Sequence, residues 1–192
     1  SLGPRDSWPQ SLRTALDICL SSRFPMLVWW GPDLVDFYND AYLPTLGDKH
    51  PSALGRPASQ VWPEAWDDLG PLAAQVLGGG GATYNQDQLL LLERHGDVEE
   101  TYWTFSYSPI AEESGGIGGI FVVATDTTDQ VLGERRLRVL GDLGELSAAA
   151  MTTAADACRA AVAVLDRHRH TVPAAVALLR EDDGGDLYPV AV

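Results

Sequence analysis

The stretch EETYWTFSYSPI, residues 99–110, alternates large aromatic side chains with small hydroxyl side chains. The aromatic set takes one parity and the hydroxyl set the other: Trp103, Phe105 and Tyr107 against Thr104, Ser106 and Ser108. Because successive side chains of a strand point to opposite faces of a sheet, this period of two predicts a β-strand over residues 100–110.

Two further strand-like runs flank this stretch, at residues 82–93 and 116–125. Short connections join them to the central run, Arg94-His95-Gly96-Asp97 on one side and Glu112-Glu113-Ser114-Gly115 on the other. Connections of four residues that contain glycine are typical of hairpins. Residues 82–125 are therefore expected to form a three-stranded antiparallel meander.

A second hairpin is predicted upstream, where apolar runs at residues 24–30 and 34–38 flank Gly31-Pro32-Asp33. Residues 39–81 carry repeated prolines, which exclude a long helix or a central strand: Pro44, Pro51, Pro57, Pro63 and Pro71. Short helices remain, the best of them at residues 66–77, before a run of four glycines. Five antiparallel strands with short helices on one side make an α+β domain.

Helices are predicted on both flanks of this domain. Residues 8–22 carry an apolar stripe at helical spacing: Leu12, Ala15, Leu16, Cys19 and Leu20. Residues 129–152 carry spacings of seven, four, three and four that resemble a heptad seam, with Arg136 in one seam position: Leu132, Val139, Leu143, Leu146 and Ala150. A further helix is expected at 154–167, then a hairpin from 174–179 and 187–192.

The composition argues against several functions. The formal net charge of −14 disfavours nucleic acid and anionic membrane surfaces, which attract basic proteins. No apolar run reaches the ~20 residues that a transmembrane helix needs, and no signal peptide opens the sequence, so a cytoplasmic location is expected. The four histidines lie in no metal-ligand spacing, and no phosphate-binding loop occurs, so neither a metal site nor a catalytic centre is expected.

Short motifs dispersed over residues 4–140 resemble one family. They are SWPQSLRT (7–14), SRFPM (22–26), WGP (30–32), FYNDAY (37–42), KHPSALGRP (49–57), VWPEAW (61–66), the 99–110 stretch and TDTT (125–128). Together they resemble the PAS domain that opens many bacterial multidomain sensor histidine kinases. The resemblance implies a five-stranded sheet in the order 2-1-5-4-3 with short helices closing a cavity over one face. Residues 153–192 resemble more weakly the first helix and two strands of a GAF domain.

This resemblance implies a domain plan and a function. Residues 1–23 are a capping helix, 24–128 the PAS domain, 129–152 a signalling helix, and 153–192 the start of an incomplete GAF-like domain. The expected function is a sensory module that binds a small molecule or a partner and regulates a downstream histidine kinase in the same chain. Two alternatives remain open: regulation of a metal-dependent serine/threonine phosphatase, and a ligand-free dimerisation scaffold.

Candidate ligand-binding residues come mostly from the aromatic side chains of the predicted cavity region: Trp29, Tyr38, Tyr42, Trp62, Trp103, Phe105 and Tyr107, with Asn39 as a polar group able to orient a ligand. The resemblance also assigns Asp126 and Thr128 to an Asp-x-Thr motif that ties the last strand to the outgoing helix, and hence to signal coupling. Short polar side chains at such a junction can bond the first free amides of a helix.

The resemblance constrains the cofactor as well. Flavin-binding light sensors of this fold carry a reactive cysteine in a Gly-Arg-Asn-Cys-type helix, and the corresponding region here contains no cysteine, which excludes that chemistry. Haem needs an axial histidine on a helix, whereas His50 precedes Pro51 and is expected in a loop. An unidentified small ligand is left. Apolar stripes on the helices at 8–22 and 130–150 also predict a homodimer of modest affinity.

Overall fold

The computed structural model describes residues 3–146, 152–180 and 187–191 of the 192-residue chain. The chain divides into two compact units, Ser1–Thr128 and Asp129–Val192.

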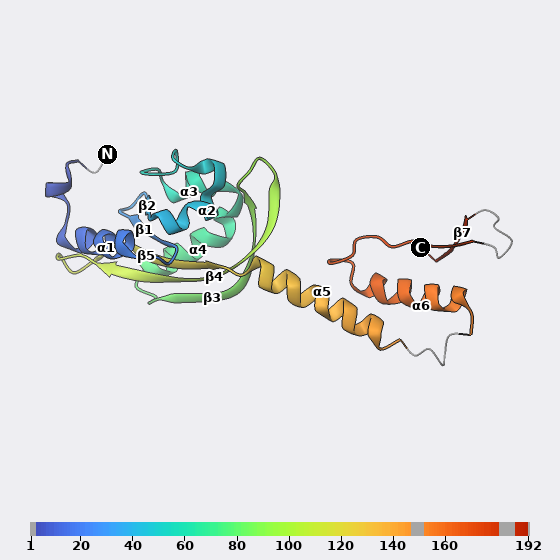
Figure 1. Cartoon of the computed structure of the whole chain (residues 1–192). Helices are drawn as coiled ribbons and strands as arrows, with labels where there is room; N and C mark the ends of the chain where they lie inside the picture. Colours follow the sequence, from blue (N-terminus) through green and yellow to red (C-terminus); the bar gives the residue numbers. More distant parts are fainter. Residues whose placement is uncertain (1–2, 147–151, 181–186, 192) are drawn as a thin grey trace. The chain divides into compact units, whose positions relative to one another are not determined.

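The first unit is built on a five-stranded antiparallel sheet (Figure 1). Its strands are β1 (Met26–Trp30), β2 (Val35–Tyr38), β3 (Thr83–Glu93), β4 (Val98–Ala111) and β5 (Ile117–Asp126). They lie in the order β2-β1-β5-β4-β3, and every neighbouring pair is antiparallel. Both the number of strands and their order are as predicted.

Short helices fill the proline-rich segment between β2 and β3. They are η2 (Asp40–Tyr42), α2 (Leu43–Leu46), η3 (Gly47–Lys49), α3 (Ala58–Val61), η4 (Pro63–Ala65) and α4 (Trp66–Leu77), and a further turn, η1 (Arg5–Ser7), opens the described chain. Figure 1 shows α2, α3 and α4 grouped over one face of the sheet. α4 has the predicted bounds and ends where the glycine run begins, since glycine favours helix termination.

The opposite face of the sheet is covered by α1 (Gln10–Ser21). Strand β1 shows the division, because its side chains alternate between two hydrophobic clusters. Leu27 and Trp29 belong to the cluster under α2–α4, whereas Val28 and Trp30 pack with α1. The sheet is thus buried on both faces near β1.

The predicted stripe on α1 is correct at four positions and wrong at the fifth. Leu12, Ala15, Leu16 and Cys19 are buried, but Leu20 is 62% exposed. Eight residues at 3.6 per turn leave Leu20 about 80° around the helix from Leu12, which puts it outside the contact with the sheet.

The second unit contains α5 (Thr128–Gly144, whose first residue belongs to the first unit), α6 (Ala154–Arg167), and a hairpin of β6 (Ala177–Arg180) and β7 (Leu187–Ala191). Helix α6 begins with a capping box between Thr153 and Asp156. Helix α5 ends at Gly144 and does not continue to residue 152 as predicted, because glycine is a poor helix former. Val139 of the predicted seam is buried and Ala150 lies outside the described residues.

Candidate ligand cavity

A cavity of about 40 Å³ lies between the sheet and the helices that cover it. Six of the eight side chains predicted for ligand binding form part of its wall: Trp29, Tyr42, Trp62, Trp103, Phe105 and Tyr107. They come from strands β1 and β4 and from the segment between β2 and β3. Leucine, valine, alanine and threonine side chains complete the wall.

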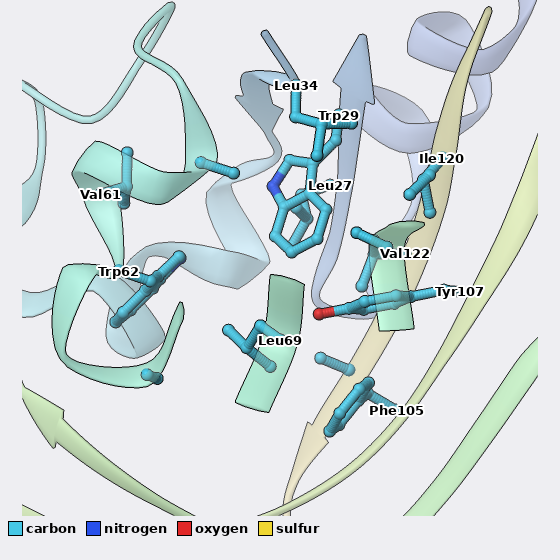
Figure 2. Packing of buried hydrophobic residues seen from close by; sticks show 14 of the residues in the cluster. Leu27, Trp29, Leu34, Val61, Trp62, Leu69, Phe105, Tyr107, Ile120 and Val122 are labelled. Carbon is cyan, nitrogen blue, oxygen red and sulfur yellow. The ribbon is translucent and has the colours of Figure 1, made fainter. Parts of the chain in front are cut away.

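Three aromatic side chains of the cavity wall, Trp29, Phe105 and Tyr107, pack against one another. The ring centroids of Trp29 and Tyr107 are 5.0 Å apart in a T-shaped pair, and those of Phe105 and Tyr107 are 5.1 Å apart. Figure 2 shows the Tyr107 hydroxyl directed inward, between Leu69 and Trp29. Burial raises the pKa of both Tyr42 and Tyr107, so their hydroxyl groups stay protonated at neutral pH and can donate hydrogen bonds.

The volume limits what the cavity holds in this conformation. A buried water needs roughly 10–15 Å³, so about 40 Å³ suits a few waters or a ligand of a few heavy atoms. Ligand pockets for larger molecules are usually about 300–1,000 Å³. A larger ligand therefore requires the covering helices to move away from the sheet.

The remaining two predicted residues do not line the cavity. The Tyr38 hydroxyl lies 3.0 Å from Nδ1 of His50. Asn39 is buried, and its side chain bonds the backbone that joins α1, β1 and η2. Its Nδ2 donates to the carbonyl groups of Cys19, Ser22 and Phe24. Its Oδ1 accepts from the N–H groups of Met26 and Tyr42. Asn39 thus holds the end of α1 against the sheet.

Sequence reasoning missed Asp36, a fully buried carboxyl group on β2. It lies directly opposite Trp29 in the β1–β2 pairing, so the two side chains point to the same face. Among the described residues, neither Asp36 oxygen nor the Trp29 indole Nε1 has a hydrogen-bond partner. The signal was present in the sequence, because Asp36 shares its parity with Leu34 and Tyr38, both of which are buried.

Burial raises the pKa of Asp36 from 3.8 to about 7. The Trp29 indole acts in the opposite direction and lowers this pKa, although the two groups do not meet hydrogen-bond geometry. Asp36 in turn raises the pKa of Tyr42 and Tyr107, two residues of the cavity wall, by electrostatic repulsion of their charged forms. The carboxyl group is therefore close enough to act electrostatically on the cavity.

Asp126 and Thr128 bond the junction between the sheet and α5. An Asp126 carboxylate oxygen accepts the Thr128 N–H at 2.9 Å, one of the first free amides of α5. The Thr128 hydroxyl accepts the N–H of Tyr102, on β4, at 2.9 Å. Arg94, from the β3–β4 connection, forms ion pairs with Asp126 at 3.5 Å and with Glu99.

Other kinds of site receive no support in the part of the chain that the structure describes. Residues 3–146, 152–180 and 187–191 contain no cluster of His, Cys, Asp and Glu that could hold a metal ion. No helix within these ranges combines the length and the apolar character needed to cross a bilayer.

The chain is similar to several solved structures. It resembles the crystal structure of a Rhodobacter sphaeroides LOV protein with a TM-score of 0.50 and 15% identity, over 85% of this chain and 91% of that one. A PAS domain from Colwellia psychrerythraea has a TM-score of 0.47 and 15% identity, over 62% of this chain and 98% of that one. A sensory box sensor histidine kinase from Vibrio cholerae has a TM-score of 0.41 and 19% identity, over 60% of this chain and 85% of that one. No curated protein matches.

At such identities the first of these likenesses supports the fold alone. The family model described as "PAS fold" matches residues 21–132, which are more than half of the chain. These residues include all five strands and the cavity between the sheet and α2–α4. The chain therefore belongs to the PAS fold family.

Proposed function

We propose that the first unit is a sensory module that binds a small molecule in its cavity and passes the signal through Asp126 and Thr128 to α5. The supporting observation is the position of two adjacent residues of β4. Trp103 forms part of the cavity wall, and Tyr102 donates its backbone N–H to Thr128. Trp103 is also the register partner of Asp126 on β5. A displacement of the cavity wall thus acts on the start of α5 within one residue.

The proposed output lies in the same protein. We propose residues 24–128 as the PAS domain, α5 as the signalling helix, and residues 153–192 as the start of a GAF-like domain. We propose further that the protein is cytoplasmic and that α5 regulates a histidine kinase domain downstream in the same chain. The hairpin that follows α6 supports the GAF-like proposal. Regulation of a metal-dependent phosphatase is the alternative output, and the residues after Val192 distinguish the two.

One observation favours a ligand-free dimerisation scaffold as a second candidate. The cavity of about 40 Å³ is much smaller than the roughly 300–1,000 Å³ of most ligand pockets. A scaffold has no need of an internal ligand, because its partner binds on the outside. Binding of any small molecule inside the cavity would rule out this candidate.

Hydrogen exchange across residues 127–135 tests the sensory proposal. Asp126→Ala removes a cap worth ~1 kcal/mol, so the first amides of α5 should exchange roughly fivefold faster while the sheet keeps its protection. Asp129→Ala is the control, because Asp129 is an exposed acidic residue in the first turn of α5. Identical exchange in wild type and Asp126→Ala would exclude this junction as the coupling element.

A further inference from the structure

The Asp36 carboxyl group and the Trp29 indole N–H are two polar groups next to the cavity, and neither meets hydrogen-bond geometry with any partner in the part of the chain that the structure describes. Both lie in the apolar layer between the sheet and α2–α4, and the carboxyl side chain is fully buried. Buried polar groups are nearly always hydrogen-bonded, because an unmade bond costs the desolvation of the group. Within the described residues, neither of the two carboxyl oxygens nor the indole N–H has a partner. A ligand, a water molecule or a proton on the carboxyl group would lower this desolvation cost.

The adjoining cavity has the chemistry of a cation-binding site. Its wall includes six aromatic side chains, and the faces of aromatic rings attract positive charge, more strongly when the cation is desolvated. The net charge of the chain, −14, raises the local concentration of cations further. A buried carboxylate is stabilised by a charged partner with N–H groups, which a small ammonium ion provides.

We propose that the Asp36 carboxylate is the polar end of a binding site for a small organic ammonium ion whose apolar part occupies the aromatic cavity. This inference rests on the proposed sensory function and specifies its ligand class. Asp36 does not itself line the cavity, whereas Trp29 does and lies opposite it. The ammonium group therefore reaches the carboxylate only if the Trp29 side chain turns aside. The volume of about 40 Å³ restricts the ligand to a compact one.

Two probes of one shape test the charge requirement. tert-Butylammonium and tert-butanol have the same branched body and differ in the charged or neutral polar group. We expect wild-type protein at constant ionic strength to bind the ammonium ion at least tenfold more tightly than the alcohol, as measured by calorimetry. We also expect the ammonium ion alone to shift the ¹³C resonance of the Asp36 carboxyl group.

Asp36→Asn keeps the side-chain shape and removes the charge, so it should abolish the preference for the ammonium ion. Asp33→Asn is the matched control: it removes an exposed carboxylate from the same hairpin and should leave the preference unchanged. If Asp36→Asn does not fold, the ¹³C titration of wild type decides instead.

Three results overturn the proposal: equal affinity for the two probes, a preference that survives in Asp36→Asn, and no binding of either probe. Equal affinity leaves a ligand-binding cavity in place and removes only the ammonium assignment. The coupling in the proposed function is judged separately, by exchange at residues 127–135, which uses neither the probes nor Asp36. The two failures are therefore distinguishable.

Discussion

At the scale of single residues, two buried polar side chains on or just after β2 behave in opposite ways. The Asn39 side chain bonds five backbone groups and so joins α1 to the sheet, whereas the Asp36 carboxyl group bonds none among the described residues. A satisfied buried amide stabilises the fold, and an unpaired buried carboxylate destabilises it. The difference makes Asp36 a residue whose cost to stability depends on pH.

The stability of the protein should fall as pH rises through the range that Asp36 titrates. Its pKa is about 7 in the folded protein and 3.8 as a model value, so the folded state holds the proton to higher pH than the unfolded chain. The penalty therefore grows between about pH 4 and pH 7 and is complete above that range. For this difference in pKa between the unfolded and the folded state, the penalty to the free energy of unfolding amounts to roughly 4 kcal/mol.

Urea unfolding at pH 5 and pH 8 measures this dependence. Asp36→Asn should be more stable than wild type at pH 8, and its advantage should shrink toward pH 5. The neighbouring tyrosines do not interfere, because burial raises the pKa of Tyr38, Tyr42 and Tyr107 above 10. An advantage that is equal at both pH values, or an Asp33→Asn variant with the same profile, contradicts the assignment to Asp36.

At the scale of secondary-structure elements, α1 is attached to the sheet through one face. Leu12 is completely buried against β1, while Ile18 and Leu20 are 54% and 62% exposed on the same helix. Backbone contacts at the end of the helix add to this packing through Asn39. The helix is thus part of the folded unit, although its outer surface carries apolar side chains.

Two leucine substitutions on α1 should separate these faces. Leu12→Ala removes a fully buried side chain and should destabilise the first unit by about 2–5 kcal/mol. Leu20→Ala, with the same chemical change at an exposed position, should change stability by less than about 0.5 kcal/mol. Thermal and urea unfolding compare the two variants. Equal losses would mean that α1 does not pack on the sheet through the Leu12 face.

At the scale of the whole molecule, apolar side chains remain exposed on helices of both units. Leu137 and Leu140 on α5 are 69% and 63% exposed, and Ile18 and Leu20 on α1 are 54% and 62% exposed. Exposed apolar patches commonly mark sites of protein association. Leu137 and Leu140, three residues apart, lie on one side of α5, whereas Ile18 and Leu20 lie about 160° apart around α1. Few apolar side chains therefore lie together on either helix, and the affinity that they can give is modest.

We expect a dimer that forms and dissociates with protein concentration. Sedimentation equilibrium over a concentration series should show the monomer converting to dimer. Two double variants identify the helix involved: Leu137→Glu with Leu140→Glu on α5, and Ile18→Glu with Leu20→Glu on α1. The variant on the helix at the interface should abolish the dimer, and the other variant should not. A strict monomer at the highest concentration contradicts the expectation.

Local sequence patterns were enough to predict the helices and strands, because their signals lie within a few residues. The period of two over residues 100–110 predicted β4, the prolines predicted the short helices, and the glycine run predicted the end of α4. The resemblance to PAS domains predicted the strand order and the presence of a cavity over one face of the sheet. Six of the eight side chains predicted for this cavity line it.

The neighbours that each side chain meets across the core follow from the three-dimensional fold and from no local pattern. Parity places Tyr38 and Asp36 on one face of β2, but the cavity, the Trp29 partner and the loss of solvent around Asp36 arise from segments far apart in the chain. Helix α5 ended earlier than its apolar spacing suggested, and Leu20 is exposed although it continues the stripe. Burial and pKa depend on the packing of all neighbours, which no local pattern contains.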